Sequence, residues 1–489
     1  MSNEEKKFSG ENVVKNSFWS VLERVCAQIV SFVISVILAR LLVPDDYGIV
    51  ALVQVFINIG ALLVERGFAS ALSQKKHPDK EDYYSVLNFG LLTSFILYAI
   101  LFRIAPNIGG WFGKYDSNLL TSVIRVMGLS LPITTIRVVM ITYIGKNMMF
   151  KKFFWATFVG TIISGGIGIL MAYKGCGVYS LVAQYLINIT IDSIILGFVI
   201  KKPWSPSLSF AKLKTLISFG WKVVISSALT TAVNSVRSTT IASKYETSDL
   251  AHYDKGESLP KIVIGNIDVA IANVLFPTMS NSQDDISKLK EIVRKFVRLS
   301  SYIIFPMLLG IFAISDNLIP LLFGEQWLPA IPYLKVFTLV YLFYPLQDAS
   351  LLSIRAIGKS GTALILDIIG KSVILALLFA LLKFGPLYIT FGYLAATIII
   401  VCINAIAMKK LIKYRFREQL FDFVINLIPA ALMLASVYFL HYLPLNGTII
   451  LLLQIVTGII VYFVISLITK NKQFLYFKSL VFKKEKRRN

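Results

Sequence analysis

Five cationic side chains lie inside long apolar stretches of this sequence, where a charged group is unusual. They are Arg24, Arg125, Arg137, Lys222 and Arg237. A charge at membrane depth is costly unless it faces a partner or a water-filled cavity. Arginine can hold phosphate oxygens through two N–H groups at once without losing its charge. This set of residues therefore predicts a cavity that binds an anionic head group, with no covalent chemistry.

Other embedded charges have different interpretations. Asp367 and Lys371 are four residues apart, as are Glu257 and Lys261, so each pair can form on one helix face. Asp268 leaves two interpretations open, a site for a coupling ion or a pair with a cation on another helix. Cations outnumber acids in the apolar stretches. That excess is expected if the translocated ligand is an anion.

The elements that must position these charges are membrane-spanning helices. The sequence is 56% hydrophobic and 16% charged, whereas a soluble domain carries about 25% charged residues. We place fourteen apolar stretches of spanning length between residues 16 and 469. Outside these stretches, Lys and Arg are concentrated at the termini and in alternate loops, which predicts that both termini are cytoplasmic. The formal net charge of +22 is therefore attributed to membrane topology and not to a nucleic-acid surface.

A set of landmarks occurs twice, about 210 residues apart. The order Phe112-Gly113, Pro132, Ile144-Gly145-Lys146 returns as Phe323-Gly324, Pro345, Ile357-Gly358-Lys359. Repeated halves are common in transporters. We predict an all-α polytopic membrane protein of about 14 transmembrane helices. It comprises two pseudo-symmetric six-helix bundles, 1–205 and 206–410, followed by two additional transmembrane helices and a basic cytoplasmic tail in 411–489. The two prolines should break the fourth and tenth helices at equivalent places.

The first helix of each predicted half carries two embedded cations at a similar separation. These are Arg24 with Arg40, and Lys222 with Arg237. If the halves pack as a pseudo-symmetric pair, the four side chains should face a shared central cavity. The stretch 226–240 is also rich in Ser and Thr. That composition fits either helix packing through small residues or a cavity wall in contact with sugars.

Enzymatic, metal and cofactor chemistry are not predicted. Cys26, Cys176 and Cys402 have no pairing or metal-ligand spacing, and the histidines form no constellation. No glycine-rich nucleotide loop ending in Lys-Ser or Lys-Thr is present. A membrane enzyme such as a polysaccharide polymerase or ligase would need a sizeable outer catalytic loop, and every predicted outward loop is short. We therefore expect a transporter that is not an enzyme.

Several short motifs resemble one known family when they are read in order. The turn 39–48 (ARLLVPDDYG) follows the first membrane helix, and an acidic and basic loop at 71–82 follows the second. Further matches are 149–152 (MFKK), 175–179 (GCGVY), 276–277 (FP) and 323–330 (FGEQWLPA). Over residues 10–415 the sequence resembles the Wzx-type polysaccharide flippases of the multidrug/oligosaccharidyl-lipid/polysaccharide exporter superfamily.

This resemblance implies an alternating-access flippase in the bacterial cytoplasmic membrane. Its substrate would be an undecaprenyl-pyrophosphate-linked oligosaccharide, moved to the outer leaflet for O-antigen, capsule, exopolysaccharide or teichuronic-type polysaccharide. Its partners would be this isoprenoid-pyrophosphate glycan, membrane lipids and polysaccharide polymerase machinery. Two alternatives in the same superfamily remain open, a flippase for the peptidoglycan lipid precursor and a cation-coupled multidrug exporter. The excess of embedded cations argues against the exporter, whose substrates are often cationic.

Overall fold

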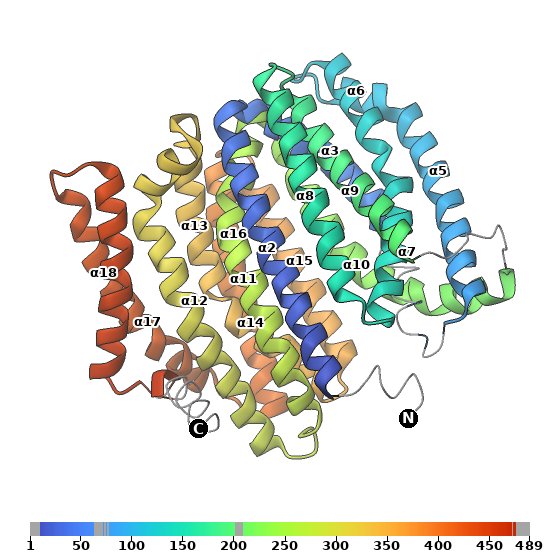
Figure 1. The fold of residues 1–489 in the computed structure, drawn as a ribbon. Coiled ribbons are helices and arrows are strands. Elements are labelled where there is room, and N and C mark those ends of the chain that lie inside the picture. Colours follow the sequence, from blue (N-terminus) through green and yellow to red (C-terminus); the bar gives the residue numbers. More distant parts are fainter. Residues whose placement is uncertain are drawn as a thin grey trace. The chain divides into compact units, whose positions relative to one another are not determined.

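The computed structural model describes residues 10–62, 72, 75, 78–200, 209–471 and 473–475. Within these ranges the regular structure is helical and contains no β-strand, so the predicted all-α class is confirmed (Figure 1). Eleven helical stretches of the described chain are long and apolar enough to cross a bilayer, and Val25–Leu41 is a shorter apolar stretch. The membrane class is thus confirmed, whereas the count of fourteen spans stays a prediction.

The internal contacts divide the chain into two compact units, Met1–Ala251 and His252–Asn489. The helices of the first unit are α2 (Gly10–Leu41), α3 (Pro44–Leu62), α5 (Lys80–Trp111), α6 (Ser117–Gly128), α7 (Ser130–Lys146), α8 (Phe150–Tyr173), α9 (Val178–Ile200) and α10 (Phe210–Lys244). Helix α11 (Thr247–Ser280) begins just before the boundary. The second unit continues with α12 (Ile286–Phe323), η2 (Glu325–Trp327), α13 (Ala330–Leu342), α14 (Tyr344–Ala356), α15 (Ser360–Leu381), α16 (Pro386–Ile412), α17 (Phe416–Phe439), η3 (Leu440–Tyr442) and α18 (Gly447–Ile468).

Helix α10 packs within the first unit, where it contacts α3 and α5. At the start of α10, Lys212 lies 2.5 Å from Asp79 and 2.7 Å from Glu81. At its end, the Lys114 ammonium donates to the carbonyl of Lys244 at 2.8 Å. The division into compact units therefore falls after α10. The predicted halves, 1–205 and 206–410, describe an internal repeat and stay a prediction.

Two helices are broken at equivalent places in the repeated landmarks. Helix α6 ends at Gly128 and α7 begins at Ser130, so Pro132 is the third residue of the new helix. Helix α13 ends at Leu342, and Pro345 is the second residue of α14. Proline lacks the N–H that a continuous helix would donate to the carbonyl four residues earlier, and its ring crowds that carbonyl. The predicted breaks of helices four and ten are confirmed.

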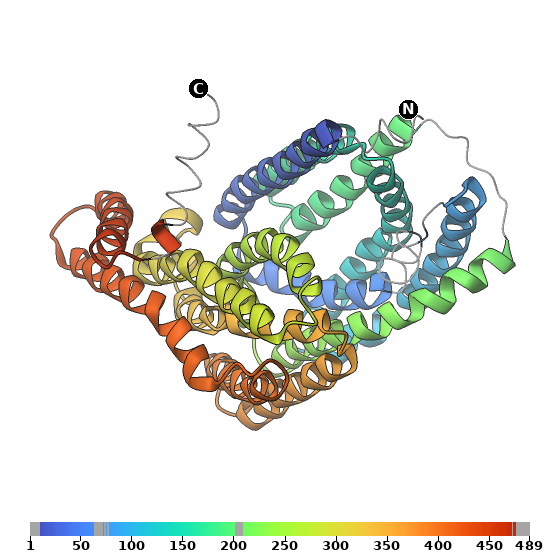
Figure 2. The ribbon, with the colours of Figure 1, turned by 90° about the horizontal axis from the view of Figure 1, so that it is seen from below.

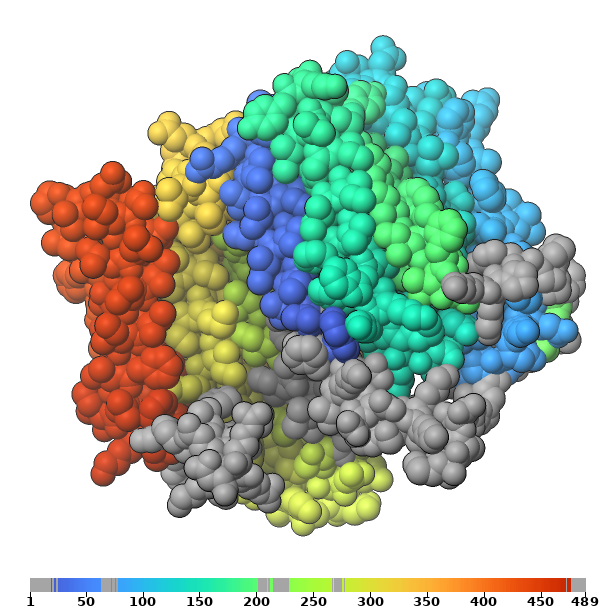
Figure 3. All heavy atoms as spheres, viewed as in Figure 1, coloured from blue at the N-terminus to red at the C-terminus, as the bar shows by residue number. Residues whose placement is uncertain are grey.

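The first unit is built around α8, which packs on α2 and on α9 (Figures 1 and 2). The contact faces of α8 carry small residues. A Cβ on Gly165 would lie 2.1 Å from Cδ1 of Ile34 on α2, and one on Gly168 would lie 3.0 Å from Cβ of Gln184 on α9. Small residues let membrane helices approach closely enough for their backbones to pack. In the space-filling view, α8 lies between α2 and α9 on the face shown (Figure 3).

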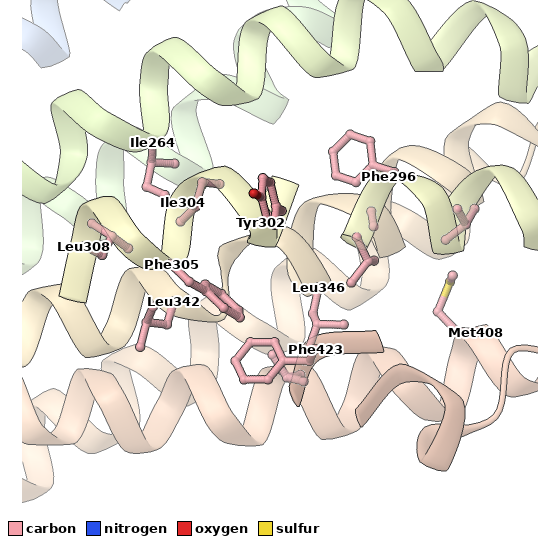
Figure 4. Packing of buried hydrophobic residues seen from close by; sticks show 14 of the residues in the cluster. Ile264, Phe296, Tyr302, Ile304, Phe305, Leu308, Leu342, Leu346, Met408 and Phe423 are labelled. Carbon is pink, nitrogen blue, oxygen red and sulfur yellow. The ribbon is translucent and has the colours of Figure 1, made fainter. Parts of the chain in front are cut away.

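The second unit has its apolar core around α12, which packs against α13, α17 and α18. Phe305 of α12 and Phe423 of α17 are both buried, with ring centroids 4.8 Å apart, and Leu342 and Leu346 pack into the same cluster (Figure 4). The rings of Phe423 and Phe343 are stacked at 5.3 Å. The two predicted trailing helices are therefore present as α17 and α18, held onto α12.

A group of ion pairs and hydrogen bonds also joins α17 to α12. The Asp422 carboxylate is fully buried and accepts from Arg294 Nε at 2.7 Å and from the Tyr414 hydroxyl at 2.8 Å. Arg298 also donates to Asp422. One turn before Asp422, Glu418 lies 2.7 Å from Lys290. Two arginines thus share one acid, which gives the ion pairs of this region an excess of positive charge.

Candidate functional site

Arg137 and Asp192 form an ion pair inside the first unit. Arg137 projects from α7 and Asp192 from α9, the two helices being in contact. Both Nε and Nη2 of Arg137 lie 3.0 Å from the same carboxylate oxygen, Oδ2 of Asp192. The side chain of Arg137 is 28% exposed, whereas that of Asp192 is 2% exposed. The acid is therefore buried inside the unit, and part of the Arg137 side chain remains at its surface.

The second carboxylate oxygen of Asp192 has an unusual environment. Oδ1 is buried and has no hydrogen-bond partner among the described residues. It lies against Gly160 of α8, where a Cβ would approach Oδ1 to 2.2 Å. One turn earlier on α9, the Asn188 amide donates to Ser164 Oγ at 3.3 Å and to Thr161 Oγ1 at 3.4 Å. A polar seam thus runs along the α8–α9 contact, and the absent side chain of Gly160 makes room for the acid.

The pair lies well inside the membrane-spanning helices. Arg137 is nine residues before the end of α7, and Asp192 is eight residues before the end of α9. At 1.5 Å per residue these separations are about 13 Å and about 12 Å. A bilayer core is about 30 Å thick, so both charges lie on the part of each helix that is expected to cross it. At that depth a charge is retained only where it has a partner or reaches water.

Arg125 is held differently from Arg137. Its guanidinium lies 4.3 Å from the ring centroid of Phe102 on α5, and its Nε is 3.4 Å from the Phe102 carbonyl oxygen. A guanidinium over an aromatic face is attracted by the ring's negative face. No carboxylate of the described residues lies within 4.0 Å of Arg125. Arg125 is therefore a half-buried cation that contacts an aromatic ring and a carbonyl oxygen.

The other predicted residues are located as follows. Arg237 lies on α10 and is buried, with 6% of the residue exposed. Arg24 and Lys222 lie on α2 and α10, but their side chains are outside the described part. The side chain of Asp268 on α11 is also outside it. All five predicted cations belong to the first unit. The structure thus joins Arg137 to an acid, and the prediction of a cavity shared by the five cations stays a prediction.

Several other embedded charges are paired. Asp367 and Lys371 lie 2.5 Å apart on α15, as their spacing predicts. Lys335 of α13 is 2.8 Å from Asp316 of α12. Glu257 accepts from the Tyr341 hydroxyl at 2.9 Å. The excess of embedded cations is therefore partly compensated in the folded chain.

Sequence reasoning missed three residues that surround the embedded cations or acids. Asp316 and Asp422 were not considered as partners, and Gly160 was not singled out. Gly160, Ser164 and Gly168 recur at four-residue spacing, which is a sequence signal for close helix packing. Among the described residues, no group of three or more His, Cys, Asp or Glu side chains could hold a metal ion.

An apolar groove lies in the second unit between α12, α17 and α18. Its volume is about 440 Å³, and its lining includes Tyr302, Pro306, Gly310, Met433 and Tyr462. The Tyr462 hydroxyl donates to the carbonyl of Tyr302 at 2.7 Å at one end of the groove. The groove is therefore a feature of the trailing helices and carries little polar chemistry.

Several known proteins have sequences similar to that of this chain. A transport protein of succinoglycan biosynthesis, ExoT of Rhizobium meliloti, is 25% identical over 68% of this chain and 66% of its own length. The lipopolysaccharide biosynthesis protein WzxC of Escherichia coli is 23% identical over 68% of this chain and 67% of its own length. A membrane protein of the cps region of Klebsiella pneumoniae is 24% identical, and 66% of this chain matches 67% of it.

Solved structures share the fold at low sequence identity. The lipid II flippase MurJ, in an inward closed conformation, superposes with a TM-score of 0.75 at 16% identity, covering 96% of this chain and all of that one. An inward-facing multidrug MATE transporter gives a TM-score of 0.60 at 15% identity and covers 81% of this chain. The family model for polysaccharide biosynthesis proteins matches residues 37–332, which is more than half of the chain. The chain therefore belongs to the polysaccharide biosynthesis protein family, and its resemblance to the Wzx-type flippases is confirmed.

Proposed function

We propose that this protein is a flippase for lipid-linked oligosaccharides. It moves an undecaprenyl-pyrophosphate-linked oligosaccharide from the cytoplasmic to the outer leaflet of a bacterial cytoplasmic membrane, with both termini in the cytoplasm. The observation that carries the proposal is the family match over residues 37–332, which includes Arg125, Arg137 and Arg237. Relatives in the same family are named for transport or biosynthesis of succinoglycan and lipopolysaccharide.

The geometry supports an anionic head group as the ligand. Arg137 lies on a membrane-spanning helix and 28% of its side chain is exposed, and this exposed part is where an oxyanion would bind. The guanidinium of Arg125 lies over the Phe102 ring and has no carboxylate among the described residues within 4.0 Å. A pyrophosphate offers several oxygens that guanidinium groups bind well. These arginines would hold the head group while the isoprenoid tail stays among lipids. No bond of the substrate changes, and polysaccharide polymerase machinery would take the product outside.

Alternating access would carry the head group across the membrane. A protein with two conformations moves a ligand when both states bind it and open to opposite sides. The broken helices α6–α7 and α13–α14 supply interruptions in both units where bending is cheap. The alternatives to this function within the superfamily are a flippase for the peptidoglycan precursor and a drug exporter. The substrate that is transported distinguishes the three.

The test is leaflet exposure of labelled lipid in proteoliposomes. The full-length chain is reconstituted with an isoprenoid-pyrophosphate oligosaccharide, and the fraction open to a membrane-impermeant reagent is followed over time. Parallel samples contain lipid II or a soluble drug cation. We expect protein-dependent exposure of the oligosaccharide lipid. Movement of the drug cation with no movement of any isoprenoid lipid would refute the proposal.

Variants connect this transport to the first unit. Removing Arg137 alone would leave the buried Asp192 without its counter-charge and could unfold the unit. The informative variant is therefore the double substitution Arg137→Gln with Asp192→Asn. Arg103→Gln is the matched control, because Arg103 is an exposed cation on α5. We expect the double variant to lose most transport and the control to retain it.

A further inference from the structure

The contact between Arg137 and Asp192 has an asymmetry that a static ion pair does not require. Nε of Arg137 donates to Oδ2 and Nη2 lies 3.0 Å from the same oxygen, although a carboxylate and a guanidinium can form two parallel bonds. The partner oxygen Oδ1 is buried and without a hydrogen bond in the described part of the chain. A buried polar atom that lacks a partner calls for an explanation, and a functional role is one of the recognised ones.

The surroundings of Asp192 supply one compensating charge. The charged group that acts on its carboxylate among the described residues is Arg137 of α7. Helix α8 presents Gly160, Thr161 and Ser164 on this side, none of which titrates. The acid of α3 nearest to α9, Asp46, contacts the start of α9 at Val178, fourteen residues from Asp192 or about 21 Å along the helix.

The other helix that touches α9 adds no second partner. Helix α6 also packs on α9, and its cation, Arg125, is engaged with Phe102 on α5. If Arg137 turned toward another anion, Asp192 would be a buried and uncompensated carboxylate. Such a group costs so much that it takes up a proton instead.

We propose that Asp192 is an exchangeable counter-ion for Arg137. In the state described here the acid neutralises the arginine. When the oxyanion of the substrate binds the exposed part of Arg137, it replaces Asp192, and Asp192 accepts one proton from the aqueous phase on a carboxyl oxygen. One O–H bond forms on the protein, and no bond of the substrate breaks. The inference rests on the proposed function, since it concerns the same head group.

Gly160 is a positioning residue in this exchange. Because it has no side chain, Oδ1 of Asp192 can lie against α8, and Oδ2 is left facing Arg137. The space around Oδ1 holds no donor among the described residues, so it favours a protonated over an ionised acid once the arginine has left. The α8–α9 seam therefore sets both the resting ion pair and the site that accepts the proton.

Proton uptake is measured with the whole purified chain in detergent. The probe is inorganic pyrophosphate, with farnesyl pyrophosphate as a second probe that carries a short isoprenoid tail. Binding is followed by isothermal titration calorimetry in two buffers of different ionisation enthalpy, which reports protons taken up for each anion bound. We expect uptake for the unmodified protein to exceed that for Asp192→Asn by about one proton. Subtracting the variant removes the titration of pyrophosphate itself.

The affinity gives a second readout. For one linked proton, the Kd of the unmodified protein should rise by up to about tenfold for each pH unit in the window where only the anion-bound state holds the proton. For Asp192→Asn, whose side chain has the same shape and cannot accept the proton, this added slope should vanish. At high pH the variant should bind at least as tightly as the unmodified protein, because Arg137 has no anionic competitor. If Asp192 had only a structural role, Asp192→Asn would instead weaken the binding of the anion at every pH.

The outcomes separate this inference from the proposed function. Equal proton uptake and equal pH slopes in the unmodified protein and Asp192→Asn would overturn the exchange, even if the oligosaccharide lipid is transported. Absence of pyrophosphate binding to the unmodified protein would overturn it as well. A proton-linked difference without movement of any isoprenoid lipid would support the exchange and refute the proposed function. Asp192→Glu, which keeps the acid, should restore part of the pH slope if the variant proteins are folded.

Discussion

Gly160→Ala should disturb the Arg137–Asp192 pair without touching either partner. The new Cβ would lie 2.2 Å from Oδ1 of Asp192, whereas ordinary van der Waals contact begins near about 3.5 Å. The carboxylate or α8 must therefore move by more than about 1 Å, which is enough to break bonds of 3.0 Å to the guanidinium. Overpacking of this kind costs about 1–3 kcal/mol.

The control for this substitution lies on the same helix. A Cβ on Gly166 would meet nothing within 4 Å, and Gly→Ala in a helix interior is favourable by up to about 1 kcal/mol. The assay is thermal unfolding of the detergent-solubilised protein. Gly160→Ala should lower the midpoint, and Gly166→Ala should leave it unchanged or raise it. A double-mutant cycle with Asp192→Ser should then show coupling, because the smaller side chain relieves the clash.

Two results would refute this reasoning. If Gly160→Ala and Gly166→Ala behave alike, Asp192 does not occupy the position described against α8. If Gly160→Ala is equally harmful in the presence and absence of Asp192→Ser, the cost arises from helix packing and not from the carboxylate. Pyrophosphate binding offers a further check, since a displaced Asp192 should change the affinity of Arg137 for the anion.

Three more predictions follow from other parts of the fold. Asp422→Asn should destabilise the second unit by about 3–5 kcal/mol, because it removes a fully buried carboxylate that pairs with both Arg294 and Arg298. Glu418, whose side chain is 29% exposed, predicts at most about 1 kcal/mol for Glu418→Gln; chemical unfolding in detergent measures both. Gly358→Ala should cost about 1–2 kcal/mol in the same assay, because its φ of 76° is left-handed. The hydrogen bond from Lys212 lowers the pKa of Asp79 to about 2, so the stability that this pair contributes should be constant from neutral pH down to about pH 4 and be lost below it. Thermal unfolding of the unmodified protein and of Lys212→Gln in detergent measures this at a series of pH values, and a difference between their midpoints that changes between pH 5 and 8 would contradict it.

The sequence predicts those features of the fold that depend on one residue or on residues close together in the chain. Pro132 and Pro345 predict the breaks of two helices, because a proline removes a specific backbone bond wherever it stands. The pairing of Asp367 with Lys371 follows from four-residue spacing on one helix. Hydropathy likewise identifies the membrane class, since the apolar length needed to cross a bilayer is a property of each segment alone.

The partners of the embedded charges could not be found in the same way. Arg137 and Asp192 are 55 residues apart, and they meet because of how α7 and α9 are rotated against each other. Helix rotation is set by many packing contacts, such as the one that places Gly160 beneath the acid, and no periodicity in a single helix encodes it. Asp422 was missed for a related reason, since hydropathy alone described the trailing helices.

The acids that pair with the embedded cations change what those cations imply about the substrate. Counting embedded cations against acids predicts a cavity with a fixed positive potential, which would attract any anion. In the structure, Arg137, Lys335 and Lys371 each lie within 3.0 Å of an acid, so these three cations are neutralised at rest. An anion can then bind Arg137 only by replacing Asp192. The free energy of binding is therefore the difference between the interactions that Arg137 makes with the anion and with Asp192, and not the full attraction of a free guanidinium. Such an exchange favours a ligand with several oxygens, such as pyrophosphate, over chloride, and it keeps the pair of Arg137 and Asp192 neutral when no anion is bound.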